Sequence, residues 1–494
     1  MIGMKSHLKH MLLTPSEMAK ADAATVDSGI ALADLVERAG QAVAASALRH
    51  FPQALRYVVL CGPGNNGKDG YVAARALAQA GASVAVYEMN EGQIGKDLLR
   101  AEEDAISRAP LAGYQPRQGD VVIDALFGAG LTRDVPDLVA ELVNKIGEAA
   151  LPLLAVDLPS GLCGRRGVPL GAAFKATRTV TFMNRKPGHL LLPGRSLCGD
   201  IEIVDIGIPA RIIRSITEGW AENHPDLWGH LLPVPDENGH KYRRGHLAVF
   251  SGPAGRTGAA RLSALAGLKR GAGLVTVASP ADAMSVNAAS LTAIMLHQID
   301  TAQVLQSWLD SAKLAAFVLG PGFGIGEKAR QFSLLLKVRP LVLDADGITS
   351  FRENPSELFS AFSGGDPHLV LTPHEGEFSR LFPDLAGNTE LSKLEKAVRA
   401  AERAHAAIVY KGADTVIAAP DGRAYINTNA PPWLATAGSG DVLAGMIGAL
   451  LAQGVPAFEA AAASVYLHGE AAKAAGRGMT AEDLAAHAGV ELDG

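Results

Sequence analysis

One segment decides the fold class of the first half of the chain: Tyr57-Val58-Val59-Leu60-Cys61-Gly62-Pro63-Gly64-Asn65-Asn66-Gly67-Lys68-Asp69-Gly70. Its apolar residues predict a buried strand, its glycines predict a loop, and residues 71–80 that follow predict a helix. Free backbone N–H groups at such a strand-to-helix turn can hold an anion. A second, unrelated glycine-rich turn, Gly438-Ser439-Gly440-Asp441, precedes a helix-forming run at 442–447. We therefore expect two catalytic domains that act on related phosphorylated ligands.

Strand-like and helix-like segments alternate on both sides of these turns, which predicts βαβ units and mainly parallel sheets. The predicted strands of the first half are 57–60, 84–87, 121–124, 153–157, 178–182 and 201–205. Those of the second half are 246–250, 273–277, 316–319, 341–344, 369–371 and 407–410. The alternation breaks at 209–244, a stretch that includes the polar run Asp236-Glu237-Asn238-Gly239-His240. The prediction is an α/β chain of two domains, residues 1–225 and 226–494.

Length and composition exclude several classes of protein. A chain of 494 residues exceeds what one hydrophobic core usually supports. Its net charge of −6 argues against a general nucleic-acid binder, which needs a basic surface. The 3 cysteines form no C-x-x-C pair and suit a reducing compartment. Because there is neither a signal-peptide apolar region nor a run of about 18 apolar residues, we expect a cytoplasmic protein without membrane contacts.

Polar residues follow the predicted strands of the first half at positions suited to ligand binding. Asp124 and Asp157 end their strands, Ser160 follows shortly after, and Asn66 lies in the first glycine loop. Ligands of open α/β sheets bind at the carboxyl ends of the strands, so these four side chains should share one crevice. Oxygen ligands favour a hard cation or hydroxyl groups over zinc. A helix N-cap would explain any single aspartate, but hardly Asp69, Asp124 and Asp157 together, each near a glycine.

The second half carries five polar or glycine-rich segments, and four of them directly follow predicted strands. They are Gly320-Pro321-Gly322-Phe323-Gly324, Asp344-Ala345-Asp346-Gly347, Thr372-Pro373-His374, Lys411-Gly412-Ala413-Asp414-Thr415 and the Gly438 turn. One G-S-G-D motif is a weak signal, and a single histidine is more often structural. Packing alone hardly explains all five in this order. The Gly438 turn forms an anion hole at a helix N-terminus, where Asp441 can reach a substrate hydroxyl.

The first half resembles the YjeF N-terminal domain, the NAD(P)H-hydrate epimerase family. The resemblance rests on Asn65-Asn66-Gly67-Lys68-Asp69-Gly70, Asp124-Ala125-Leu126-Phe127-Gly128 and Val156-Asp157-Leu158-Pro159-Ser160-Gly161. It implies a Rossmann-like domain that interconverts the R and S forms of hydrated NAD(P)H, with potassium on Asn66, Asp124 and Ser160. The implied substrate contacts are Asn65, Asn66, Gly67, Lys68, Asp69, Gly128, Ala129, Gly130, Leu131, Thr132, Arg133, Asp134 and Asp157. Lys68 stands where the family usually has glycine. Our hypothesis makes Asp157 the general acid/base, because epimerisation needs a group that moves a proton.

The second half resembles the YjeF C-terminal domain, the ADP/ATP-dependent NAD(P)H-hydrate dehydratase of the ribokinase-like superfamily. The resemblance implies a nucleotide site at Lys411, Gly412, Ala413, Asp414, Thr415 and Gly440. It implies that the hydrated substrate contacts Gly324, His374 and Asp441. Asp441 would activate the substrate hydroxyl for phosphorylation by ADP or ATP with Mg²⁺, and elimination of phosphate would follow. The sequence does not distinguish ADP from ATP.

Three functional hypotheses follow. The leading one is a bifunctional repair enzyme whose first half supplies the S epimer that its second half consumes, with NADHX or NADPHX and an adenine nucleotide as small-molecule partners. The alternative is a ribokinase-like small-molecule kinase with an N-terminal ligand-binding module. The third makes the first half a non-catalytic scaffold, against which the complete set of Asn66, Asp124, Asp157 and Ser160 argues. We expect a homo-oligomer, for which the alanine-rich helical region at 18–50 could supply an interface.

Overall fold

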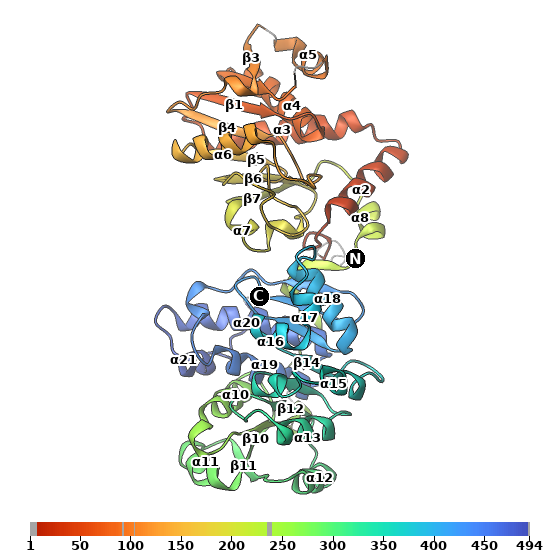
Figure 1. Ribbon diagram of the computed structural model, residues 1–494, viewed down its shortest axis with the longest axis vertical. Helices are drawn as coiled ribbons and strands as arrows, with labels where there is room; N and C mark the ends of the chain where they lie inside the picture. The colour runs from red at the N-terminus through yellow and green to blue at the C-terminus, as the bar shows by residue number, and fades with distance from the viewer. Residues whose placement is uncertain (1–6, 91–92, 103, 235–239, 493–494) are drawn as a thin grey trace. The chain divides into compact units, whose positions relative to one another are not determined.

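The structure is a computed structural model that describes residues 7–90, 93–102, 104–234 and 240–492. It contains two compact units, Met1–Trp220 and Ala221–Gly494 (Figure 1). Both are α/β, as predicted. Of the polar run expected at the junction, residues 236–239 lie outside the described part of the chain.

The first unit is built on a seven-stranded, wholly parallel sheet of order β3-β2-β1-β4-β5-β6-β7. Its strands are β1 (Arg56–Cys61), β2 (Val84–Glu88), β3 (Ile106–Pro110), β4 (Asp120–Ala125), β5 (Leu153–Val156), β6 (Arg178–Phe182) and β7 (Asp200–Val204). Its helices are α2 (Pro15–Asp27), α3 (Leu32–His50), α4 (Asn65–Gln79), α5 (Gln93–Leu99), α6 (Asp137–Glu148), α7 (Gly194–Leu197) and α8 (Ala210–Ile216). Strand order reverses between β1 and β4, which opens a crevice at their carboxyl ends.

Both faces of this sheet are covered at its central strands, which explains why β1, β4 and β5 are buried along almost their whole length. Side chains of β1 alternate between two hydrophobic cores. Tyr57, Val59 and Cys61 pack with α3 and α4. Val58 and Leu60 pack on the other face with α6. The strands are thereby fixed, and their carboxyl ends form a rigid platform for the polar residues that follow them.

The alanine-rich N-terminal region forms two helices, α2 and α3. Thr14 begins α2 with a capping box, in which its Oγ1 accepts from Glu17 N at 3.2 Å and its N–H donates to Glu17 Oε2 at 2.7 Å. Gly29 follows α2 with φ of +97°, a conformation that favours glycine. In α3, Ala44 and Ala47 are buried in the unit's own core. The helical prediction for this region is confirmed.

The second unit contains a ten-stranded sheet of order β11-β10-β9-β12-β13-β14-β15-β16-β17-β8. Its strands are β8 (Trp220–Glu222), β9 (His246–Phe250), β10 (Leu274–Ser279), β11 (Met295–Gln298), β12 (Ala316–Leu319), β13 (Leu341–Leu343), β14 (Leu369–Leu371), β15 (Ala407–Tyr410), β16 (Val416–Ala418) and β17 (Ala424–Ile426). The pairs from β11 to β15 are parallel, whereas β15, β16 and β17 pair antiparallel.

Helices α10, α19 and α20 pack on this sheet, and α10 and α19 also pack on each other. The helices of the unit are α9 (Pro225–Trp228), α10 (Gly258–Lys269), α11 (Met284–Ser290), α12 (Ala302–Ser311), α13 (Glu327–Leu335), α14 (Asp346–Thr349), α15 (Pro355–Ala361), α16 (Glu375–Leu381), α17 (Pro383–Ala386), α18 (Lys393–Ala404), α19 (Ser439–Ala452), α20 (Ala457–Ala475) and α21 (Ala481–Ala486). Among all the helices that the structure describes, we find none with the length and apolar character needed to span a bilayer.

Candidate active sites

A cavity of about 650 Å³ opens at the carboxyl edge of the first sheet. It gathers most of the predicted epimerase residues, which follow three different strands, β1, β4 and β5. The predicted residues that line it are Asn65, Asn66, Asp69, Gly128, Ala129, Gly130, Leu131, Thr132, Arg133, Asp134 and Asp157. Gly67, Lys68, Asp124 and Ser160 do not line it. Of these, Asp124 and Ser160 are completely buried.

The expectation that Asn65, Asn66 and Asp69 lie in a loop is wrong, because α4 already begins at Asn65. Glycine permits this early start by allowing close backbone contacts. A Cβ on Gly67 would come within 1.9 Å of the Gly62 carbonyl oxygen, and a Cβ on Gly70 within 2.6 Å of Ala125 Cβ. The first turn of α4 therefore lies tightly over the ends of β1 and β4, and its N-terminus faces the cavity.

Lys68 fits this helical geometry without disturbing it. Its ammonium donates to Asn65 Oδ1 at 3.0 Å, one turn back along α4. The side chain is partly exposed rather than turned into the cavity lining. The residue that departs from the family pattern thus occupies the outer side of the helix start.

Ser160 and Asn66 lie against the backbone of Phe127 and Gly128, and Asp124 is hydrogen-bonded to Ser160 and to Leu126 N. Ser160 donates to Asp124 through its N–H at 2.7 Å and through its hydroxyl at 2.6 Å, and Phe127 N donates to Ser160 Oγ at 2.8 Å. A Cβ on Gly128 would lie 3.0 Å from Asn66 Oδ1. Burial raises the pKa of Asp124 to about 6. A buried carboxylate with two neutral oxygen groups is a donor set that suits a hard cation of low charge.

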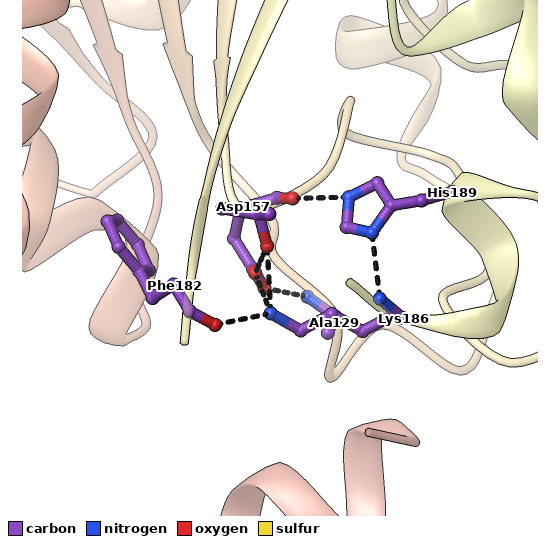
Figure 2. Close-up of polar contacts among 6 residues, drawn as sticks. Ala129, Asp157, Phe182, Lys186 and His189 are labelled. Atoms are coloured by element: carbon purple, nitrogen blue, oxygen red, sulfur yellow. Dashed lines mark hydrogen bonds and ion pairs between the residues drawn. The ribbon is translucent and has the colours of Figure 1, made fainter. Parts of the chain in front are cut away.

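Asp157 is held at several points by hydrogen bonds from neighbouring elements (Figure 2). Its Oδ1 accepts from Lys186 Nζ at 2.5 Å and from Thr181 Oγ1 at 3.0 Å, and its Oδ2 accepts from Ala129 N at 3.0 Å. The backbone is left-handed, with φ of +66°. Burial alone would raise the pKa of Asp157, but the adjacent Lys186 ammonium outweighs it and keeps the pKa below its usual value. Asp157 is therefore a fixed, ionised carboxylate.

His189 completes this arrangement from behind. Its Nδ1 accepts from Lys186 N at 2.9 Å, so the proton is on Nε2, which donates to the Asp157 carbonyl oxygen at 2.9 Å. Burial and the charge of Lys186 lower the pKa of His189 to about 3. The imidazole is thus neutral, and its two hydrogen bonds join Asp157 to the loop that carries Lys186 (Figure 2).

Lys186, His189 and Asp22 contribute to the site and were missed by the sequence reasoning. Lys186 and His189 follow β6 in the segment Asn184-Arg185-Lys186-Pro187-Gly188-His189, a polar strand end of the kind that marked the other site residues. Asp22 lines the cavity from α2, and nothing in its local sequence marks it. Burial raises the pKa of Asp22 to about 6, and the charge of Lys186 opposes that effect.

Replacing Lys186 with methionine is expected to destabilise the first unit by about 3 kcal/mol near pH 7, because Asp157 becomes a buried charge without a partner. The folded-state pKa of Asp157 is lowered, so its ionisation stabilises the fold above the unfolded-state pKa. That contribution is lost as the pH falls through the folded value, and the variant should lack it. Urea unfolding of wild type and variant across the acid range measures the difference.

Lys145→Met is the matched control, because Lys145 is exposed and lies 3.8 Å from Glu141 in a surface ion pair. It should cost less than about 1 kcal/mol. If Lys186→Met and Lys145→Met lost the same free energy of unfolding, the buried Lys186–Asp157 ion pair would not be structurally important.

The second sheet gathers its polar residues at the carboxyl ends of β12 to β15. Lys411 follows β15 and donates to Asp344 Oδ1, after β13, at 2.8 Å, and its Nζ lies 3.9 Å from Glu377 Oε2. Burial alone would lower the pKa of Lys411, but Asp344 and Glu377 outweigh it and raise the pKa. Lys411 is therefore a firmly charged cation at this edge.

The Gly438 turn lies beside that cation. Gly438 has φ of +87°, and α19 starts at Ser439. A Cβ on Gly440 would lie 3.5 Å from Lys411 Nζ. Burial, together with the charge of Asp344, raises the pKa of Asp441 to about 6. The site thus combines a lysine, a helix N-terminus and a carboxylate suited to remove a proton near neutral pH.

Two residues that the sequence reasoning missed position this turn. Ser263 Oγ donates to the Asp441 carbonyl oxygen at 2.6 Å. His468 Nε2 donates to the Ser439 carbonyl oxygen at 2.9 Å, and burial lowers the pKa of His468 to about 4, so the ring is neutral. Their partners are backbone atoms far along the chain, which no local motif indicates.

The other predicted dehydratase residues surround the same edge. Gly324, after β12, has φ of +103° and donates its N–H to Asp346 Oδ2 at 2.9 Å. His374, after β14, caps α16 through its Nδ1, which accepts from Gly376 N at 3.0 Å, and its side chain is 55% exposed. This exposure leaves the His374 ring accessible to a ligand.

Residues 411–415 form a compact turn after β15. Thr415 Oγ1 donates to the Gly412 carbonyl oxygen at 2.7 Å and accepts from Gly412 N at 3.1 Å. Lys393 Nζ donates to Asp414 Oδ1 at 2.6 Å. Gly412 and Ala413 are exposed at the tip of this turn.

Comparison with known proteins gives matches across both units. Two family models match the chain: "YjeF-related protein N-terminus" over residues 32–188 and "NAD(P)H-hydrate dehydratase" over residues 247–492. The bifunctional NAD(P)H-hydrate repair enzyme Nnr of Moorella thermoacetica is 37% identical over 516 residues, covering 96% of this chain and 95% of that protein. The Escherichia coli enzyme of the same name is 32% identical over 478 residues, covering 92% of this chain and 88% of that protein. A solved ADP/ATP-dependent NAD(P)H-hydrate dehydratase from Bacillus subtilis, co-crystallised with ATP and Mg²⁺, is 25% identical, covers 53% of this chain and 94% of that chain, and has a TM-score of 0.44.

Proposed function

This chain belongs to the family of bifunctional NAD(P)H-hydrate repair enzymes, and we propose that it returns both epimers of hydrated NADH and NADPH to the intact cofactors. The N-terminal domain, residues 1–225, interconverts the R and S hydrates. The C-terminal domain, residues 226–494, dehydrates the S hydrate at the expense of ADP or ATP. The observation that carries the proposal is the presence, in one chain, of an Asp157-centred cavity and of the Lys411–Asp441 site.

In the epimerase cavity the residues that line its walls bind the hydrated cofactor. Asn65, Asn66 and Asp69 lie on one side. Gly67 and Lys68 of the same helix start do not line the cavity but belong to the proposed set of substrate contacts. The segment Gly128-Ala129-Gly130-Leu131-Thr132-Arg133-Asp134 lies on the other side. Asp157 is the general acid/base in this proposal, and its fixed carboxylate meets the geometric demand for proton transfer.

Potassium is the cation that we propose for Asn66, Asp124 and Ser160. The donor set fits, because it offers oxygen ligands with a single negative charge. Asn66 Nδ2 is buried, and no described residue accepts a hydrogen bond from it, so this N–H₂ group remains available to an acceptor atom of a ligand, and the amide Oδ1 is the atom that would face the cation. When bound, the cation supplies positive charge beside the buried Asp124 carboxylate and fixes the Phe127–Gly128 backbone that lines the cavity.

Exchanging potassium for tetramethylammonium is expected to lower epimerase activity several-fold and to lower the unfolding midpoint of the first unit, because a ligand that binds only the folded state stabilises it. Calorimetry and an epimer-resolved assay measure the two effects. Dehydratase activity serves as the internal control. Identical epimerase rates and midpoints in the two salts would contradict the cation site.

In the dehydratase site, Lys411, Gly412, Ala413, Asp414, Thr415 and Gly440 contact the nucleotide, which brings Mg²⁺ with its phosphates. Gly324, His374 and Asp441 contact the S hydrate. Asp441 removes the proton of the C6 hydroxyl as that oxygen attacks the terminal phosphorus and the bond to the nucleotide breaks. Phosphate then leaves C6, a proton is lost from C5 to water, and the C5=C6 double bond that forms restores the dihydronicotinamide.

We also propose that the chain forms a homo-oligomer. Val26 of α2 and Leu32 and Leu48 of α3 are large apolar side chains that the fold leaves exposed. Sedimentation of the full chain, with Leu48→Glu as the variant, tests this proposal: a monomeric wild-type chain would refute it.

Incubation of the full chain with separated R and S hydrates, and with ADP or ATP, tests the proposed function. Recovery of dihydronicotinamide absorbance from both epimers supports both activities. Recovery from the S hydrate alone would refute the epimerase assignment. Nucleotide consumption with a phosphorylated small molecule and no recovery from either epimer would favour the small-molecule kinase.

A further inference from the structure

Besides Asp134 at its exposed rim, the epimerase cavity contains three carboxyl groups from three different elements: Asp22 of α2, Asp69 of α4 and Asp157 after β5. Only Asp157 contacts a cation, through Lys186 at 2.5 Å. Asp69 is 8% exposed, and no described residue donates a hydrogen bond to its carboxyl. A buried carboxyl group without a partner, directed into a substrate cavity, costs free energy while it is ionised. Its presence there points to a functional use.

The surroundings of Asp69 and Asp157 favour opposite protonation states. Burial, followed by the negative charges of Asp157 and Asp22, raises the pKa of Asp69 well above its usual value. Lys68 opposes this only weakly, because its ammonium turns to Asn65. The pKa of Asp157 is lowered. Two titratable groups whose environments separate their pKa values are the usual arrangement of an acid and a base in one site.

We infer that Asp69 is the proton donor of the epimerase site and that Asp157 is the carboxylate that accepts a proton on the opposite face of the substrate. This inference rests on the proposed epimerase function and deepens it. It assigns to Asp69 a role beyond substrate contact.

The step balances as follows. Asp69 transfers its proton to the C6 hydroxyl while the C6–O bond breaks, so the bonding pair leaves with water and the N1 lone pair forms a C6=N1 iminium. A water molecule adds to the other face of C6, its proton goes to Asp157, and the iminium pair returns to N1. Exchange with solvent restores the starting protonation. The negative charges of Asp157 and Asp22 stabilise the cationic intermediate.

The other charged groups around the cavity influence the pH range over which Asp69 is protonated while Asp157 is ionised. Asp22 faces it from α2, and Lys186 approaches from the loop after β6 next to the neutral His189. Arg133 and Asp134 lie at the exposed rim after β4. On α3, Glu37 is paired with Arg75 of α4 at 2.5 Å. Asp22 is therefore the nearby uncompensated charge that helps to keep Asp69 protonated.

Asp69→Asn tests the inference, because an amide reproduces the shape of a protonated carboxyl but cannot donate this proton. The variant should keep its stability and lose about a hundredfold or more in epimerase kcat. In the wild type, the rate should fall as the pH rises through the pKa of Asp69. Asp22→Asn should move this alkaline limb to lower pH and, because the charge of Asp22 also stabilises the cationic intermediate, should lower the maximal rate. Asp27→Asn, an exposed position at the end of the same helix, should change neither.

Infrared spectroscopy of the chain with ¹³C-labelled aspartate gives a readout that does not require turnover. Above pH 6, where Asp22, Asp124 and Asp441 become ionised, the band of a protonated carboxyl should persist in wild type and should be absent in Asp69→Asn. A wild type without this band, or an Asp69→Asn variant with unchanged kcat and alkaline limb, would overturn the inference. A wild type that shows the band but epimerises neither hydrate would refute the proposed function and would leave the Asp69 protonation state established.

Discussion

The Asp441→Asn variant is expected to lose nucleotide-dependent dehydration by about a thousandfold in kcat, because the amide cannot take the proton of the attacking hydroxyl. The fold should tolerate this change. Asparagine has nearly the same shape, and the hydrogen bonds from Ser263 and His468 reach backbone atoms of the turn rather than the altered side chain. Single-turnover assays with the S hydrate and saturating nucleotide measure the chemical step.

The pH dependence gives a second test of the same residue. A base must be ionised, and burial raises the pKa of Asp441 to about 6. Wild-type dehydration should therefore fall as the pH drops through about 6, whereas the residual activity of the variant should lack this limb. Asp310→Asn, on the exposed side of α12, serves as the control. Epimerisation by the Asp441→Asn variant should stay at the wild-type rate, and a parallel loss of both activities would contradict the assignment.

The Asp157→Asn variant is expected to lose epimerisation by about a thousandfold and to lose about 3 kcal/mol of unfolding free energy. The loss of stability arises because Lys186, with its side chain 1% exposed, keeps a buried charge without its partner. An assay that separates the R and S hydrates measures the activity, and urea unfolding measures the stability.

The double variant Asp157→Asn/Lys186→Met separates the two effects. Removing both charges should restore most of the stability, since neither partner remains as an isolated buried ion. Epimerisation should stay low, because the carboxylate is still absent. Recovery of activity along with stability would mean that Asp157 acts only through the fold.

Much of the sheet architecture could be predicted from the sequence because its strands are buried on both faces. The bounds of β6, β12, β14 and β15 agree with prediction at both ends. The predicted parallel pairing and the convergence of most polar strand ends on one edge are also confirmed. Edge strands such as β3 and β11 escaped prediction, because partly exposed strands have too few apolar residues to show the pattern.

The parts of the sites that escaped prediction depend on contacts between distant residues. Lys186 becomes significant only because folding brings its ammonium to Asp157, 29 positions earlier in the chain. His468 matters through one backbone carbonyl on a neighbouring helix. The sequence predicts that this helix starts at residue 71, but α4 starts at Asn65. The glycines of this segment, which suggest a loop, instead allow the helix to approach the backbone of β1 closely. The local sequence indicates where strands end, but it does not indicate which distant residues come into contact.

The burial of Lys186 also makes it a natural reporter of opening in the first unit. An amine-modifying reagent reaches the ε-amino group only when the loop after β6 detaches from the sheet edge, whereas Lys145 on the surface of α6 is available at all times. The modification rate of the Lys186 peptide, relative to that of the Lys145 peptide, therefore measures how often this site comes apart under native conditions. The reagent is applied to the intact chain while the second unit remains folded, and mass spectrometry of the two peptides then gives the ratio of modification rates.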